Sequence, residues 1–148
     1  MDCVFCAIAA GQLPSYRLYE DEDFIVLLDI FPLRPAHVLI VSRQHAPSLH
    51  ELPAPVQARL LPLAERLARV LRRAGYGEYG INLLINDGPE ANQHVPHLHL
   101  HLIPRRRGDV PALLLRVLTR FLPLGRQRLQ RRLLTEQQRL QAALAEEA

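Results

Sequence analysis

Three histidines alternate with leucines between His97 and Ile103, in the order His-Leu-His-Leu-His-Leu-Ile. In a β-strand successive side chains point to opposite faces and rise ~3.3 Å per residue, so these imidazoles would share one face at a spacing of ~6.6 Å. The leucines would then occupy the opposite face, where they can be buried. This period of two predicts a strand over residues 97–103 with one apolar face turned inward.

The remaining sequence predicts an α+β fold with about five short, mostly antiparallel strands and one principal helix. Apolar residues recur at helical spacing over residues 55–74, and Gly75 supplies a stop. Pro62 lies inside this pattern, and a proline costs about 3 kcal/mol in a helix interior, so we expect a kink or a later start. Four further strands are expected over residues 17–20, 24–29, 37–42 and 81–86.

A chain of 148 residues is long enough for one domain with an extension. We expect a main domain over residues 1–107 and a helical, basic C-terminal extension over residues 108–148. Within the extension a short apolar helix is predicted over residues 112–122, and a polar helix follows from Arg126 to Ala148. The net charge of +3 is unevenly distributed, because the excess of arginine lies after residue 104.

The arginine-rich segment 126–139 raises the question of a nucleic-acid or membrane surface. It contains no aromatic residue for base stacking, and its arginines alternate with leucines at helical spacing. We therefore expect an amphipathic helix that packs on the core or on a partner chain, with neither nucleic acid nor membrane as a partner. No basic N-terminal region leads into an apolar run, so a cytoplasmic protein is expected.

The row of histidines has three possible interpretations. It could be the polar outer face of a half-buried strand, or a three-histidine metal site, although neighbours on one flat strand do not converge easily on a tetrahedral ion. The third interpretation is catalysis, in which the central His99 attacks a substrate while its neighbours bind anionic oxygens. Three imidazoles in a row lose solvation and repel one another when protonated, so they are a poor choice for stability alone. We therefore favour catalysis.

The segment from His97 to Ile103 resembles the signature of the histidine triad (HIT) superfamily. The preceding segment 86–93 and the upstream segments 29–32 and 35–41 also resemble that family, the last two its nucleotide-binding strand pair. An N-terminal Cys-x-x-Cys recurs in its bacterial members. The resemblance covers roughly residues 2–107 and implies a HIT-like fold. It also implies a homodimer in which helix and strand edges of two chains form one continuous sheet.

The resemblance implies a hydrolase that cleaves at the α-phosphate of a purine nucleotide and releases a nucleoside monophosphate. Phosphoramidates, aminoacyl-adenylates and dinucleoside polyphosphates are the candidate substrates. His99 would form a covalent nucleotidyl–histidine intermediate, while His101 and His37 would lie at the phosphate oxygens. His94 stands where relatives have a hydroxyl residue, and it could act as a general acid or face water. A non-catalytic nucleotide-binding or signalling module on the same fold is the alternative.

The resemblance also implies a set of nucleotide-binding residues. Asp29 would hold the ribose hydroxyls, although an aspartate here could instead cap the turn before Pro32. Asn86 would add an amide donor near the phosphate, and Ile30 would line the base pocket. The remaining expected contacts come from Gln93, His99 and His101, with apolar positions at Phe5, Ile8 and Leu28.

Cys3 and Cys6 have the short spacing of structural zinc sites and are too close in sequence to close a useful disulfide loop. The resemblance completes this pair with His45 and His97, which implies a closed Cys₂His₂ structural zinc site. The alternative is two reduced, buried cysteines that behave as small hydrophobic residues. No organic cofactor is expected.

Overall fold

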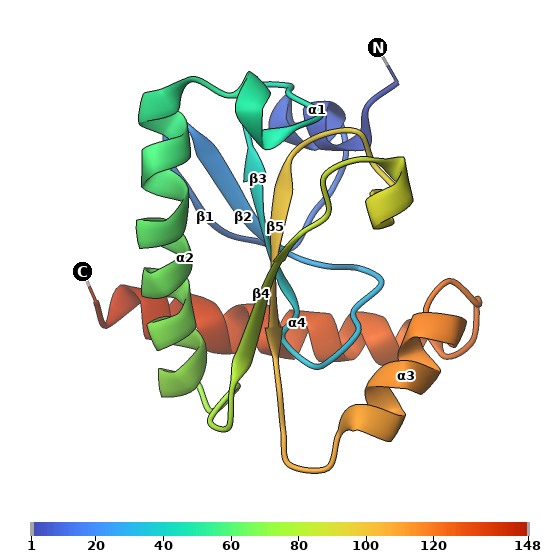
Figure 1. The fold of residues 1–148 in the computed structure, drawn as a ribbon. Coiled ribbons are helices and arrows are strands. Elements are labelled where there is room, and N and C mark those ends of the chain that lie inside the picture. Colours follow the sequence, from blue (N-terminus) through green and yellow to red (C-terminus); the bar gives the residue numbers. More distant parts are fainter. Residues whose placement is uncertain (1, 148) are drawn as a thin grey trace.

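The computed structural model describes residues 2–147 and contains one five-stranded antiparallel sheet (Figure 1). The strand order is β1-β2-β3-β5-β4. The strands are β1 (Arg17–Glu20), β2 (Phe24–Leu28), β3 (Val38–Ser42), β4 (Ile81–Ile85) and β5 (His99–Pro104). The helices are α1 (Val4–Ala9), α2 (Ala54–Arg73), α3 (Val110–Thr119) and α4 (Arg126–Ala145), with 3₁₀ turns η1 (Leu49–Glu51) and η2 (Pro89–Ala91).

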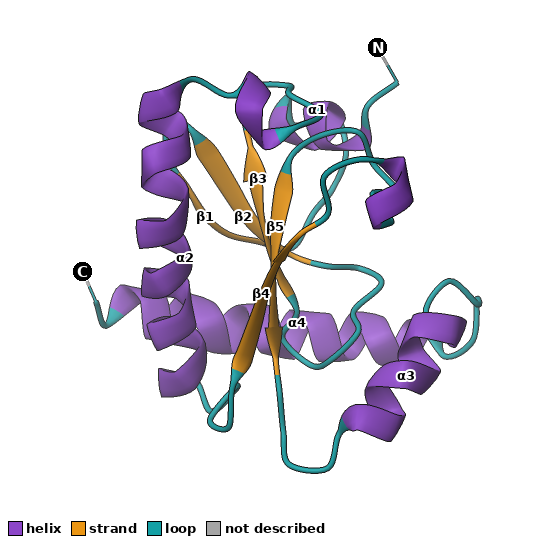
Figure 2. Ribbon diagram, viewed as in Figure 1, coloured by secondary structure: helices purple, strands orange, loops and turns teal. Residues whose placement is uncertain are grey.

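One face of the sheet is covered by α2 and α4 (Figure 2). The alternation that the sequence predicts for residues 97–103 decides which β5 side chains lie there. Leu98, Leu100 and Leu102 are almost fully buried against the two helices. The opposite face carries the histidines and is covered only in part, by Phe5 and Ile8 of α1 over β2 and β3. Burial of one face thus leaves the other available for a site.

The predicted strands and helices are present, with ends that differ by up to three residues. The strand predicted over residues 97–103 begins at His99, and the short apolar helix is Val110–Thr119 instead of 112–122. The expectation that Pro62 delays the start of the principal helix is wrong, because α2 begins at Ala54. Proline has no backbone N–H, so the carbonyl of Ala58, four residues earlier, lacks its usual helical donor. Pro62 and Ala58 are both exposed, so water can hydrogen-bond to that carbonyl.

The C-terminal extension packs on the rest of the chain. Leu133, Leu140 and Ala143 of α4 are buried in the main core cluster, with neighbours on α2 and β1. Gln137 donates a hydrogen bond of 2.9 Å to the carbonyl of Arg17. The amphipathic helix predicted here therefore lies against this chain's own core. Among residues 2–147, no helix combines the length and the apolar character that crossing a bilayer requires.

Candidate active site and metal-binding cluster

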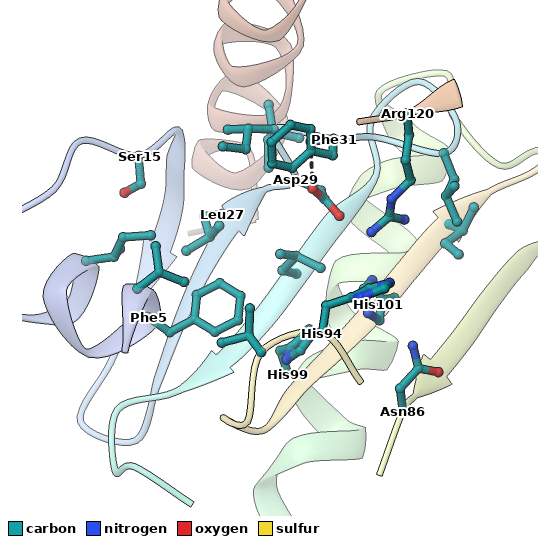
Figure 3. A pocket seen from close by; sticks show the side chains of 18 of the residues that line it. Phe5, Ser15, Leu27, Asp29, Phe31, Asn86, His94, His99, His101 and Arg120 are labelled. Atoms are coloured by element: carbon teal, nitrogen blue, oxygen red, sulfur yellow. Dashed lines mark hydrogen bonds between the residues drawn. The ribbon is translucent and has the colours of Figure 1, made fainter. Parts of the chain in front are cut away.

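A cavity of about 580 Å³ opens on the histidine face of the sheet (Figure 3). Its size falls in the range of ~300–1,000 Å³ that is common for small-molecule sites. Segments far apart in the chain form its walls: α1, the end of β2, β5, the loop before β5, and α3. Nine residues that the sequence assigns to the site line this cavity: Phe5, Ile8, Leu28, Asp29, Ile30, Asn86, His94, His99 and His101.

The ring of His99 is held in one tautomer by its own strand. Its Nδ1 lies 2.6 Å from the carbonyl oxygen of His97, and a carbonyl can only accept, so Nδ1 carries the hydrogen. Nε2 therefore keeps its lone pair. Burial lowers the pKa of His99, so the ring stays neutral near pH 7. A neutral, oriented imidazole with a free lone pair is a nucleophile.

The ring of His101 is oriented through His37. The backbone N–H of Leu33 donates to Nδ1 of His37 over 3.1 Å, so Nε2 of His37 carries hydrogen. That Nε2 donates to Nδ1 of His101 over 2.9 Å, which leaves the hydrogen of His101 on Nε2. Burial lowers the pKa of both rings to about 3. His101 Nε2 is buried and has no partner within residues 2–147, so it is a donor suited to an anionic oxygen.

Asp29 both shapes a turn and faces the cavity. Its Oδ1 accepts a hydrogen bond of 2.8 Å from the backbone N–H of Phe31, which is the turn-capping role that the sequence left open. Its Oδ2 lies 3.7 Å from Nε2 of His37, which is too long for a strong hydrogen bond. Because Asp29 also lines the cavity, this second oxygen remains able to accept from a ligand hydroxyl.

Two of the predicted site residues do not line the cavity. His37 is fully buried behind His101 and reaches the site only through that ring. The amide of Gln93 accepts from the backbone N–H of Gly88 over 2.9 Å and donates to the carbonyl of Pro47 over 2.7 Å. In this conformation Gln93 braces the loop before β5.

The exposed His94 packs edge-on against the ring of Phe121, with centroids 5.5 Å apart.

The four predicted metal ligands converge at the N-terminal end of β5. Nδ1 of His97 lies 3.3 Å from Sγ of Cys3 and 3.2 Å from Nδ1 of His45, and Sγ of Cys6 lies 3.3 Å from Nδ1 of His45. All four ligand atoms lie within 4.8 Å of one another. Zinc bonds of ~2.3 Å to sulfur and ~2.0–2.1 Å to nitrogen give tetrahedral edges of ~3.3–3.8 Å, so the cluster fits zinc.

The orientation of His97 supports the same conclusion. Its Nε2–H donates to the carbonyl of Ser42 over 2.6 Å, so the lone pair lies on Nδ1, toward the two sulfurs. Such a bond from the second ring nitrogen is the usual partner of a metal-ligating histidine. Burial lowers the pKa of His97 and so favours the neutral ring that a metal requires.

The sequence analysis missed one wall of the cavity. Val117, Arg120 and Phe121 reach it from α3 and the residues that follow that helix. Phe121 packs against Phe31, with ring centroids 5.1 Å apart. The spacing i, i+3 and i+4 places the three side chains on one side of a helix. This spacing was the signal in the sequence that could have grouped them. What this side would face depends on how α3 returns to the sheet.

The fold and the cavity define an α+β protein with a cavity of small-molecule size beside a row of histidines. More specifically, the chain belongs to the histidine triad family, because the HIT domain matches residues 10–108. It is 40% identical to an adenosine 5'-monophosphoramidase of Candida albicans over 70% of each chain. It is also 39% identical to an adenylylsulfatase of Arabidopsis thaliana, over 73% of this chain and 54% of that protein. The names of these relatives support a nucleotide hydrolase activity.

Similarity to a solved structure extends through the C-terminal helices. A zinc-bound histidine triad family protein of Mycobacterium smegmatis superposes with a TM-score of 0.74 at 36% identity. The match covers 99% of this chain and 95% of that one. It therefore includes α3 and α4, which lie beyond the part of the chain that matches the HIT domain.

Proposed function

We propose that this protein hydrolyses a purine nucleotide at its α-phosphate through a covalent nucleotidyl–histidine intermediate on His99. The observation that carries the proposal is the hydrogen bond from Nδ1 of His99 to the carbonyl of His97, which leaves Nε2 as a lone-pair nucleophile in the cavity. The enzyme names of the relatives support the same reaction class.

In the first step Nε2 of His99 attacks phosphorus, the bond to the leaving group breaks, and the electron pair departs with that group. His101 donates its unpartnered Nε2–H to a phosphate oxygen whose charge must be stabilised. Asn86, the residue after β4, adds its side-chain amide to the same cavity. In the second step water attacks phosphorus, the nitrogen–phosphorus bond breaks, and the nucleoside monophosphate leaves with His99 restored.

The remaining lining residues suit the nucleoside. Oδ2 of Asp29 accepts from the ribose hydroxyls, and the apolar wall of Phe5, Ile8 and Ile30 receives the base. His94 at the cavity edge is the candidate proton donor to a leaving group that needs one, such as an amine. Gln93 would need to leave its loop contacts before it could bind nucleotide.

The test is turnover of adenosine 5'-phosphoramidate and of diadenosine triphosphate by the wild type and by His99→Ala. We expect AMP release from at least one substrate and a loss of at least about 10³-fold in kcat for the variant, because the nucleophile is gone. His50→Ala is the matched control, since His50 is exposed and does not line the cavity. Intact-protein mass spectrometry after rapid quenching should detect one adenylyl group on the wild type only.

A non-catalytic nucleotide-binding module on the same fold is the competing function. It would bind AMP measurably in a calorimetric titration and release no AMP from either substrate. Full activity in His99→Ala would also refute the covalent mechanism, provided that circular dichroism gives the same fold for both proteins.

We further propose that Cys3, Cys6, His45 and His97 hold a structural zinc ion. When bound, such an ion supplies no reaction chemistry, because four protein ligands leave no open position. Its role would be to tie the N-terminal segment and the loop after β3 to the residues just before β5, next to the nucleophile. A homodimer in the cytoplasm, with residues 1–107 as the HIT domain and 108–148 as an extension, completes the proposal.

A further inference from the structure

The C-terminal extension forms part of the cavity itself. Val117, Arg120 and Phe121 line it, and Phe121 packs against both Phe31 and His94. These contacts bring the extension to the same cavity as the histidines of β5, as Figure 3 shows for Arg120. Part of the cavity wall therefore comes from residues beyond the HIT domain match.

Arg120 is a cation without a counterion. Its Nε is buried and has no hydrogen-bond partner, and the guanidinium forms no ion pair with any carboxylate of residues 2–147. The two nearby arginines differ, since Arg116 donates to the carbonyl of Pro32 and Arg132 pairs with Glu136. The guanidinium of Arg120 lies 4.8 Å from the ring centre of Phe121, which holds it in position.

The titratable groups that line the cavity with Arg120 are neutral histidines and one carboxylate. Burial lowers the pKa of His37, His99 and His101, and the positive charge of Arg120 lowers each further, so these rings are neutral at pH 7. That carboxylate, Asp29, accepts from the backbone of Phe31 through Oδ1 and forms no ion pair with Arg120 among residues 2–147. A partly desolvated guanidinium in such a place is stabilised by an anion that enters the cavity.

The position of Arg120 indicates which anion it meets. In Figure 3, His101 lies between His99 and the guanidinium of Arg120. In the proposed function the donor of His101 binds an oxygen of the α-phosphate, and an attack by His99 would be roughly in line with the bond that breaks. The leaving group would then move away from His99, and in this view the guanidinium of Arg120 lies farther from His99 than His101 does.

We propose that Arg120 binds a phosphoryl or sulfuryl group attached to the α-phosphate, so that the enzyme favours substrates with an anionic leaving group. This inference rests on the proposed function. When the P–O bond breaks, the electron pair leaves on a sulfate or phosphate oxygen, which needs no proton, and Arg120 stabilises the charge that develops. A phosphoramidate instead loses ammonia, which requires a proton and gains little from a guanidinium.

The test compares kcat/KM of the wild type and Arg120→Gln on three substrates: adenosine 5'-phosphosulfate, diadenosine triphosphate and adenosine 5'-phosphoramidate. Loss of a charged hydrogen bond predicts that kcat/KM falls about 10- to 100-fold for adenosine 5'-phosphosulfate, diadenosine triphosphate or both. For adenosine 5'-phosphoramidate it should fall less than about threefold. The substrate that falls identifies the sulfuryl or the phosphoryl group. An equal fall on all three, or no fall on any, would overturn the proposal.

Arg72→Gln is the charge-matched control. Arg72 is exposed on α2, on the other face of the sheet, and its side chain makes no hydrogen bond or ion pair with the described residues. The Arg72→Gln substitution removes the same unit of charge as Arg120→Gln. It therefore separates the local contact of Arg120 from the effect of net charge. A fall in Arg72→Gln as large as that in Arg120→Gln would contradict a local binding role.

A binding measurement tests Arg120 even if the wild type turns over no substrate. Calorimetric titration with AMP and with the non-hydrolysable α,β-methylene adenosine diphosphate compares one phosphoryl group with two. We expect Arg120→Gln to weaken binding of the second ligand about 10-fold and of AMP less than about threefold. Equal changes for both ligands, or none, would refute the role of Arg120. Loss of turnover alone would refute only the proposed hydrolysis.

Discussion

At the residue scale, backbone groups fix the histidine tautomers that the chemistry needs. The carbonyl of His97 fixes His99, and the N–H of Leu33 fixes His101 through His37. A carbonyl can only accept and an N–H can only donate, so neither tautomer is left to solvent. The two rings are thereby given opposite roles, since His99 presents a lone pair and His101 presents a hydrogen.

The buried pair His37 and His101 predicts acid sensitivity. Both have a pKa near 3 in the folded chain, below the value of about 6.5 expected when unfolded, so the unfolded chain binds more protons between these limits. Their contribution to stability is complete above about pH 6.5 and is lost as pH falls toward 3. Each ring contributes up to about 1.4 kcal/mol per pH unit, measurable by urea unfolding at several pH values.

His37→Gln should flatten this dependence between pH 4 and 6, because one of the buried titrating rings is absent. His50→Gln, which removes an exposed ring, should leave the slope as in the wild type. The measurements are made at equal zinc content, since metal loss at low pH would add its own slope. An unchanged slope in His37→Gln would contradict the assignment.

The proposed zinc site predicts that Cys6→Ser removes the metal. Purified wild type should carry about one zinc ion per chain by elemental analysis, and the variant close to none, because a hydroxyl is a poor replacement for thiolate. The melting temperature should fall in the variant, and a chelator should lower it in the wild type but not in the variant. Zinc retained by Cys6→Ser, or a chelator without effect, would count against the site.

At the element scale, the last helix carries part of the core. Leu140 of α4 is 1% exposed and belongs to the cluster shared with α2 and the sheet, whereas Leu134 of the same helix is 49% exposed. Leu140→Ala should lower the free energy of unfolding by about 2–5 kcal/mol, because it leaves a cavity. Leu134→Ala should cost about 0.5 kcal/mol or less. Equal effects in urea unfolding would mean that α4 does not dock as described.

The same scale explains how α3 reaches the site. Arg116 donates through Nε and Nη2 to the carbonyl of Pro32, in the loop after β2. This contact and the stacking of Phe121 on Phe31 attach α3 to the segment that contains Asp29. Helix and loop therefore form one wall, although 84 residues separate Arg116 from Pro32.

At the scale of the whole molecule, β4 is an edge strand with an open side. Within residues 2–147 it pairs only with β5, and its Leu83 and Leu84 are 47% and 44% exposed. An apolar edge with unpaired backbone groups favours pairing with a second strand. The homodimer proposed from the family resemblance would use this edge, joining two sheets into one.

Light scattering after size-exclusion chromatography tests that assembly. The wild type should have the mass of two chains, and Leu83→Lys should shift it toward one, because a charge at the edge must be desolvated on pairing. Leu134→Lys, at a similarly exposed position on α4, is the control and should remain dimeric. A monomeric wild type at micromolar concentration would refute the dimer.

The sequence by itself determined the features that local backbone geometry controls. Alternation along a strand put three histidines on one face and three leucines on the other, and helical spacing located α2 and α4. The resemblance to the histidine triad family then supplied roles for residues that lie far apart in the chain. These predictions needed only side-chain periodicity and short motifs, so strand and helix identities were correct while their ends shifted by up to three residues.

Only the tertiary structure decided which groups meet. The register of β3 against β5 brings His37 behind His101, and the return of α3 brings Arg120 into the cavity. The same packing turns Gln93 toward its own loop and places Pro62 on the exposed side of α2, where it does not interrupt the helix. Such contacts join residues tens of positions apart. Their geometry follows from how whole elements pack, and periodicity along the chain carries no information about it.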